Sequence, residues 1–161
     1  MKRSMFLLLT ASVLLAGCGY STESIWRQDV RTIAVPIFEN RSLRRGFEFD
    51  LTKAVTREIM RRTDYTIADK KDADTVLLGE IIDYRTPVLA EDSADEVFEI
   101  STSVTMHLTW QDQRTGNILF EGEVSESGNA VVRTGGNRYT AREQAFNKIA
   151  HRIVNRLLSK W

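Results

Sequence analysis

An unbroken alternation of residues over positions 97 to 110 limits the fold of this chain more than any other feature. A period of two is typical of a β-strand that is buried on one face and exposed on the other. One face carries Phe98, Ile100, Thr102, Val104, Met106, Leu108 and Trp110, and the other carries Glu99, Ser101, Ser103, Thr105, His107 and Thr109. The pattern therefore predicts a long half-buried strand, whose apolar face a second layer of structure must cover.

The segment after this strand turns back on it. Residues 111–117 contain Arg114-Thr115-Gly116-Asn117, which is a turn signal, and alternation then resumes from Ile118 to about Ser127. The two alternating segments predict an antiparallel hairpin. Residues 128–137 include Gly135-Gly136, and we expect them to form a flexible connection.

Two segments have the three- and four-residue spacing of amphipathic helices. The first covers residues 47–62, and the second begins at Thr140 and runs to the end of the chain. Thr140 and Glu143 form a capping-box signature at the start of the second helix. The positions expected to be buried against the sheet are Leu51, Val55, Ile59, Phe146, Ile149, Ile153 and Leu157.

Three further segments have the composition of strands. Residues 30–37 are rich in β-branched side chains, and Pro36 places this run at an edge or at the end of a strand. Residues 65–67 predict a short strand, and residues 75–84 predict a central strand that ends before Pro87. The order of the elements predicts an α+β two-layer sandwich, in which two helices pack on a mixed or antiparallel sheet of about four strands.

The first eighteen residues match a bacterial lipoprotein signal. Lys2 and Arg3 form a basic start, and residues 5–15 form an apolar stretch too short to span a bilayer as a stable helix. The motif Leu15-Ala16-Gly17-Cys18 is a small-residue cleavage site that ends in the cysteine to which the diacylglyceryl group is attached. The alternatives are an ordinary secretory signal with a chance cysteine, or a short buried helix.

This signal divides the chain into three parts. We predict a signal peptide at residues 1–17, a lipidated tether at residues 18–29 and a single α+β domain at residues 30–161. Gly19 follows the cysteine, which favours sorting to the outer membrane with the domain on the periplasmic side. Cys18 is the one cysteine of the sequence, so packing and not a disulfide must stabilise the fold.

Composition argues against two classes of function. Lysine and arginine number 22, as do aspartate and glutamate, and this balance argues against binding to nucleic acid. No second apolar run approaches the roughly 20 residues that a membrane-spanning helix needs. We therefore expect a domain that is attached to the membrane by its lipid alone.

The sequence contains none of the familiar catalytic motifs. It has no nucleophile elbow, no Walker phosphate loop and no paired-histidine zinc motif. His107 and His151 lack partners at the spacing of metal ligands. An acidic stretch contains Glu91, Asp92, Asp95, Glu96 and Glu99, and we interpret it as a solvated loop because it lacks the glycine of a calcium loop. We predict no catalytic residues, no metal and no cofactor, and a protein that is not an enzyme.

Arginines gather at both ends of the first predicted helix. Arg41, Arg44 and Arg45 precede it, and Arg57, Arg61 and Arg62 lie near its end. A guanidinium group donates two parallel hydrogen bonds to a phosphate, so these six residues are candidate contacts to a phosphorylated glycolipid or to a partner. The alternative is a solvated helix face whose cations complement the helix dipole.

Several short segments, spread over most of the chain, are similar to segments of a known protein family. They are Cys18-Gly19-Tyr20, Thr32-Ile33-Ala34-Val35-Pro36-Ile37-Phe38-Glu39-Asn40, Ala73-Asp74-Thr75-Val76-Leu77-Leu78-Gly79-Glu80-Ile81, the hairpin around Arg114-Thr115-Gly116 and the final helix. Together they resemble the LPS-assembly lipoprotein LptE family. The resemblance implies an outer-membrane lipoprotein in which two helices pack on a sheet, and which plugs the β-barrel LptD and helps it insert lipopolysaccharide into the outer leaflet.

A second class of function is compatible with the same start of the domain, in which a predicted strand over residues 30–37 precedes a predicted helix over residues 47–62. It is a periplasmic-facing lipoprotein that activates peptidoglycan synthases or forms part of a secretion pore. The resemblance implies LptD as the protein partner and lipopolysaccharide as a further one. Co-purification with a large barrel partner distinguishes the two classes.

Overall fold

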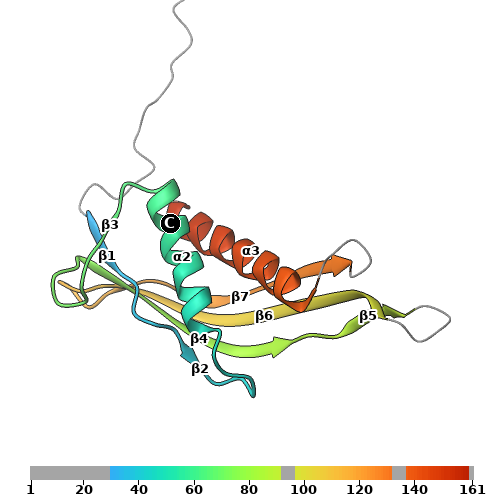
Figure 1. Cartoon of the computed structure of the whole chain (residues 1–161). Helices are drawn as coiled ribbons and strands as arrows, with labels where there is room; N and C mark the ends of the chain where they lie inside the picture. Colours follow the sequence, from blue (N-terminus) through green and yellow to red (C-terminus); the bar gives the residue numbers. More distant parts are fainter. Residues whose placement is uncertain (1–29, 92–96, 132–136, 160–161) are drawn as a thin grey trace, which may run out of the picture.

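The computed structural model describes residues 30–91, 97–131 and 137–159. Two helices, α2 (Glu48–Arg62) and α3 (Arg138–Leu158), lie on one face of a seven-stranded sheet (Figure 1). The strands are β1 (Thr32–Ala34), β2 (Glu39–Asn40), β3 (Thr66–Ile67), β4 (Thr75–Arg85), β5 (Val88–Glu91), β6 (Val97–Asp112) and β7 (Ile118–Val131). The predicted α+β sandwich is confirmed, with seven strands in place of about four.

The long strand β6 organises the sheet. β4 and β5 pair antiparallel with one edge of β6, and β7 pairs antiparallel with the other edge from Glu99 to Gln111. β1 and β2 pair with β4 in parallel, and β3 pairs with β1 in parallel, so the sheet is mixed. The predicted hairpin and the predicted central strand are both confirmed. Among the described residues, β7 has no neighbouring strand other than β6.

The predicted strand over residues 30–37 is wrong in its extent. β1 ends at Ala34, and pairing with β4 resumes only at Glu39. Between these two points the chain advances by five residues while β4 advances by four, from Val76 to Glu80. Pro36 lies in this interruption, where its missing N–H removes a donor from the ladder.

The predicted flexible connection over residues 128–137 is wrong at its start, because β7 continues to Val131. A Cβ at Gly128 would lie 2.2 Å from the carbonyl oxygen of Ala141 and 2.5 Å from the nitrogen of Ala145 on α3. Gly128 is therefore required where the helix backbone approaches the strand, and it is no loop signal. Gly135-Gly136 lies outside the described residues.

The acidic stretch is also part of the sheet at both of its ends. Glu91 belongs to β5, so the predicted solvated loop is wrong there. Glu99 belongs to β6, as the predicted strand over residues 97–110 requires. Asp92, Asp95 and Glu96 lie outside the described residues. A proline at position 87 ends β4 as predicted, but the chain then forms β5 along β6.

The two helices begin differently from one another. α2 matches the predicted range of residues 47–62 to within one residue. α3 begins at Arg138, before the predicted Thr140, because Asn137 is the N-cap and its Oδ1 accepts a hydrogen bond from the backbone N–H of Thr140 at 3.0 Å. The predicted capping box at Thr140 is wrong.

The core lies between the helices and one face of the sheet. All seven predicted helix positions are buried, namely Leu51, Val55, Ile59, Phe146, Ile149, Ile153 and Leu157. They pack in one cluster with residues of β4 and β6, including Leu77, Ile81, Met106, Leu108 and Trp110. The apolar face predicted for β6 is buried from Ile100 to Trp110, and the side chain of Phe98 is outside the description. No described helix covers the opposite face of the sheet (Figure 1).

Candidate functional site

The six arginines predicted as contacts fall into two separate groups. Arg41, Arg44 and Arg45 lie between β2 and α2, in residues 41–46, which we call the arginine loop, and Arg57, Arg61 and Arg62 lie in the second half of α2. A helix of 15 residues is about 22 Å long. A single phosphate therefore cannot contact both groups, and each has its own surroundings.

Side chains hold the arginine loop in one conformation. Oδ1 of Asn40 accepts hydrogen bonds from the backbone N–H and the hydroxyl of Ser42, at 2.9 and 2.7 Å. Nδ2 of Asn40 donates to the carbonyl of Arg44 at 2.8 Å and to Glu48 at 3.0 Å. Glu48 also accepts from the N–H of Gly46, whose φ of +98° favours glycine. The hydrogen bond from Asn40 is the main reason that the pKa of Glu48 lies below its ordinary value.

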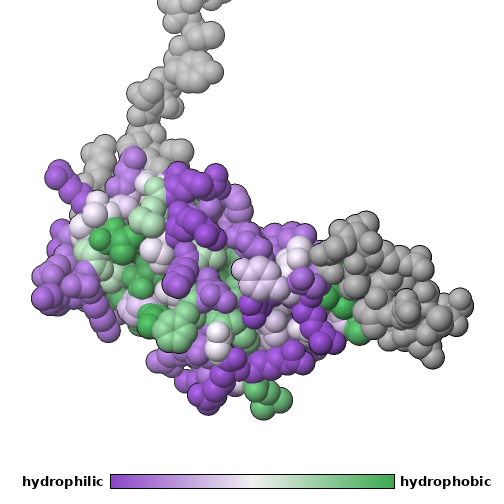
Figure 2. Space-filling model, viewed as in Figure 1, coloured by the Kyte–Doolittle hydropathy of each residue, from purple (hydrophilic) through white to green (hydrophobic). Residues whose placement is uncertain are grey.

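The tip of the arginine loop projects into solvent. Leu43 is fully exposed, at 105% of the reference area of a leucine. The guanidinium of Arg44 lies 5.9 Å from the ring centroid of Tyr84. Arg41 forms an ion pair with Glu80 of β4 while its side chain stays 73% exposed. Figure 2 shows a hydrophobic protrusion at the bottom of an otherwise mostly hydrophilic surface, where Figure 1 places this loop.

A buried carboxylate holds the end of the second group. Glu58 is 8% exposed, and Arg61 donates to it through Nε at 3.0 Å and through a terminal nitrogen at 2.9 Å. A terminal nitrogen of Arg62 lies 3.5 Å from Glu58, and Nδ1 of His151 on α3 lies 2.9 Å from it. Burial opposes the ionisation of Glu58, but the hydrogen bonds from Arg61 and the nearby positive charges outweigh it and hold its pKa below the ordinary value. This ion-pair cluster joins α2 to α3.

Arg57 belongs to the second group by its position on α2, but its surroundings differ from those of the Glu58 cluster. It lines a cavity of about 140 Å³ between the two helices, together with Lys53 and Arg142. Arg142 also lies 3.7 Å from Asp50 of α2. Both acidic and basic side chains line this small cavity. We therefore interpret it as part of the packing between α2 and α3 and not as a ligand site.

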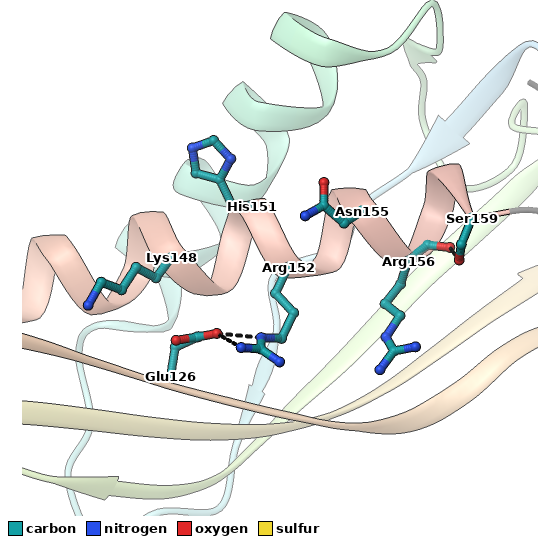
Figure 3. Close-up of a pocket in the computed structure, with 7 residues that line it drawn as sticks. All are labelled: Glu126, Lys148, His151, Arg152, Asn155, Arg156 and Ser159. Carbon is teal, nitrogen blue, oxygen red and sulfur yellow. Dashed lines mark hydrogen bonds and ion pairs between the residues drawn. The ribbon is translucent and has the colours of Figure 1, made fainter. Parts of the chain in front are cut away.

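A groove that the sequence analysis missed runs along α3. It has a volume of about 480 Å³, and its lining residues are Glu126, Lys148, His151, Arg152, Asn155, Arg156 and Ser159 (Figure 3). Lys148, Arg152 and Arg156 recur at four-residue spacing, which places them on one side of the helix. That spacing is the signal by which the sequence could have revealed the groove. We call this surface the basic groove.

The cations of the basic groove are positioned by the neighbouring strand. Arg152 forms an ion pair with Glu126 of β7, toward which Figure 3 shows it pointing. Lys148 donates to the carbonyl of Ser127 at 2.8 Å. The guanidinium of Arg156 lies 6.0 Å from the ring of Phe120. With three cations and one carboxylate, the groove has the chemistry to bind an anion such as a phosphate group.

His107 lies on the uncovered face of the sheet. Its Nε2 is 3.3 Å from Glu121 of β7. The residues that the structure describes contain no group of three histidine, cysteine, aspartate or glutamate side chains that could hold a metal ion. In the same ranges, no helix is long and apolar enough to cross a bilayer.

Charge is divided between the two layers of the fold. The two helices together carry nine basic and four acidic residues, whereas the strands carry nine acidic residues and one basic residue. The balanced composition of the whole chain conceals this separation. Part of this opposite charge is used between the layers, as in the ion pair of Arg152 on α3 with Glu126 on β7.

The sequence pattern of the lipopolysaccharide-assembly family LptE matches residues 30–157. The chain belongs to the LptE family. All seven strands, α2, α3 as far as Leu157 and the basic groove up to Arg156 lie within the matched range. Members of this family serve lipopolysaccharide assembly and are not enzymes, so the protein is not an enzyme. No curated protein matches the chain.

Solved structures share the fold of this LptE-family chain at low sequence identity. The hypothetical protein CT253 from Chlamydia trachomatis has a TM-score of 0.60 at 13% identity, over 80% of this chain and 96% of its own. Protein XCC0632 from Xanthomonas campestris has a TM-score of 0.59 at 11% identity, over 83% and 86%. The lipoprotein GNA1162 from Neisseria meningitidis has a TM-score of 0.50 at 13% identity, over 79% and 97%. Likeness at this level shows the fold alone.

Proposed function

We propose that the protein is an outer-membrane lipoprotein that assembles with the β-barrel LptD, plugs it, and helps it insert lipopolysaccharide into the outer leaflet. Residues 1–17 are the signal peptide, and Cys18 carries the lipid that anchors the domain on the periplasmic side. The observation that carries this proposal is the LptE-family match over residues 30–157.

The distribution of charge supports a role beside a phosphorylated glycolipid. The basic groove and the arginine loop both offer guanidinium groups, which bind phosphate through paired hydrogen bonds. On the uncovered sheet face, Ser103, Thr105 and His107 of β6 are partly exposed, and the apolar Leu78 of β4 is exposed beside them. The polar side chains of β6 suit the polar interior of an outer-membrane barrel.

Crosslinking in living cells tests the partner. A photoreactive residue is placed singly at Glu123 on the uncovered sheet face, at Lys70 in the turn between β3 and β4 and at Asn155 in the basic groove. A plug inside a barrel is surrounded, so at least two of these three positions should crosslink to LptD. The chain without a photoreactive residue, irradiated in the same way, is the control.

An absence of crosslinks to a barrel would contradict the plug proposal. If the protein is folded and lipidated but no surface position reaches a barrel, the plug proposal fails. The periplasmic activator or secretion-pore component then takes its place.

Intact-mass analysis tests the anchor. Protein extracted from membranes should begin at a di- or triacylated Cys18, and Cys18→Ser should block processing. A mass that fits the unmodified chain would contradict the lipoprotein assignment.

A further inference from the structure

We propose that the arginine loop docks the domain on an anionic lipid surface, where Leu43 inserts among the acyl chains and Arg44 and Arg45 contact the phosphate groups. The loop is a second point of membrane attachment, in addition to the lipid on Cys18. It would fix the orientation of a domain that a lipid tether alone leaves free to rotate.

The first observation is an apolar side chain that the fold keeps in water. Leu43 is fully exposed, although leucine gains free energy when it leaves water. The loop cannot bury it by collapsing, because the hydrogen bonds of Asn40 to Ser42, Arg44 and Glu48 fix the backbone on both sides of the tip. A braced loop that presents a leucine to solvent is suited to a ligand that covers it.

The second observation is the charge around that leucine. The segment from Arg41 to Phe47 contains three arginines and no acidic residue. Arg44 and Arg45 follow Leu43 directly, and both are exposed. Their backbone positions adjoin the tip, so these long side chains can reach the surface of a ligand that covers Leu43.

These two observations favour a lipid surface over a protein. Protein interfaces are anchored by several apolar residues packed together at the centre, with polar residues at the rim. The arginine loop instead has one apolar residue at a protruding tip with cations beside it. That arrangement matches a bilayer interface, where apolar side chains enter the acyl region and basic side chains stay at the phosphates.

The geometry allows the loop and the anchor to meet the same membrane. The start of β1 and the arginine loop are separated along β4, and the sheet continues beyond both of them through β5, β6 and β7 (Figure 1). From the level of Thr75 to that of Ile81 on β4, the distance is about 20 Å. The predicted tether, residues 18–29, has twelve residues and can extend to about 40 Å. This step rests on the proposed lipid anchor.

Fluorescence quenching in vesicles tests the proposal. The lipidated full chain carries Leu43→Cys labelled with an environment-sensitive fluorophore, since Cys18 is otherwise its one cysteine and is blocked by lipid. It is reconstituted into vesicles of phosphatidylglycerol and phosphatidylethanolamine, or of phosphatidylcholine alone. A matched chain carries the label at Met60→Cys on α2, where the native side chain is also exposed. We expect quenchers within the bilayer to act at least fivefold more strongly at position 43 than at position 60, and only in the anionic vesicles.

Charge variants in the labelled protein test the role of the arginines. R44Q/R45Q should lower the inserted fraction by roughly tenfold or more, since each basic residue at an anionic surface is worth about a factor of five. K70Q/K71Q removes the same charge from an exposed turn between β3 and β4 and should leave insertion unchanged. Asn40→Ala changes no charge, but it should reduce insertion because it removes the brace of the loop.

Three results would overturn the proposal. In the first, aqueous iodide reaches the label at position 43 as readily as the label at position 60. In the second, K70Q/K71Q reduces insertion as much as R44Q/R45Q, which indicates a general charge effect. In the third, position 43 is protected only when a barrel protein is added, which indicates a protein occupant. The vesicles otherwise contain no barrel, so failure of the LptD proposal leaves this test intact, and the mass of the purified chain reports separately on the lipid anchor.

Discussion

Nδ1 of His151 lies 2.9 Å from the Glu58 carboxylate, and this contact ties α3 to α2 above the core. Glu58 also receives two hydrogen bonds from Arg61. Burial opposes the ionisation of this carboxylate, but the hydrogen bonds from Arg61 and the nearby positive charges hold its pKa below the ordinary value of 4.5. A group whose pKa is lowered by folding stabilises the folded state above its unfolded pKa, and this stabilisation is lost as the pH falls through the folded pKa.

Glu58→Gln should lower the free energy of unfolding by about 1 to 3 kcal/mol at pH 7, because Arg61 and Arg62 lose their charged partner and His151 loses its contact with a carboxylate. The difference from the wild type should begin to shrink as the pH falls below about 4.5, where the carboxylate of the unfolded chain is protonated, and it should be lost once the pH is below the lowered pKa of the folded state. Urea unfolding at a series of pH values measures it. Glu143→Gln on the exposed face of α3 is the control and should show no such trend. If the difference in free energy of unfolding stays constant across the acid range, the charge of the Glu58 carboxylate does not stabilise the fold.

Ile149→Ala or Ile153→Ala should each lower the free energy of unfolding by roughly 2 to 5 kcal/mol, because each side chain is fully buried between α3 and the sheet. Gln144→Ala, on the exposed side of the same helix, should change it by less than about 0.5 kcal/mol. Denaturant unfolding of the three variants gives the comparison. A loss below about 0.5 kcal/mol at both isoleucines would mean that the buried face of α3 is misassigned.

Gly128→Ala should be more damaging than Gly122→Ala, although both glycines lie on β7. A Cβ at Gly128 meets the backbone of α3 at 2.2 Å, and a backbone cannot move aside without separating helix from strand. A Cβ at Gly122 meets only the ring of Phe120, at 3.1 Å, and a side chain can rotate away. We expect a loss of about 3 kcal/mol or more at Gly128 and about 1 kcal/mol at Gly122, measured by thermal unfolding. Equal losses would contradict the close approach of α3.

Single substitutions at Arg44, Arg45 or Arg61 should weaken co-purification of the protein with a barrel partner only modestly, by a few-fold at most. A plug depends on the shape of a large surface more than on one side chain. Arg61 is in addition occupied by Glu58 within the protein. Quantitative co-purification from membranes provides the measurement, with the wild type as reference. Complete loss of the complex from any one substitution in a folded protein would show that binding is concentrated at that arginine.

The sequence predicts well the elements whose pattern is local and long. The alternation around Met106 and the helical spacing around Ile149 each extend over a dozen residues, and both correspond to structure. The errors arise where a residue type has two physical uses. Gly128 marks a close helix approach instead of a loop, and Asn137 is a better cap than Thr140 because it stands at the true helix start.

The candidate site was harder to predict, because the sequence does not show which side chain each arginine contacts. Arg61 and Arg44 have the same side chain and lie near the same helix. Only the fold shows that Arg61 is paired with Glu58 while Arg44 lies beside an exposed leucine. The basic groove depends on α3 lying beside β7, a neighbourhood that no local spacing contains.

The position of β7 at the border of the sheet has a consequence for self-association. An open strand edge is a template on which a second copy of a chain can add a strand of its own. On β7 the ammonium group of Lys148 already occupies the carbonyl of Ser127, and Glu121 and Glu123 project from the strand into solvent. Two copies joined along this edge would displace that lysine and bring like charges together. The exposed edge of β7 therefore carries features that oppose the addition of a strand from a second copy.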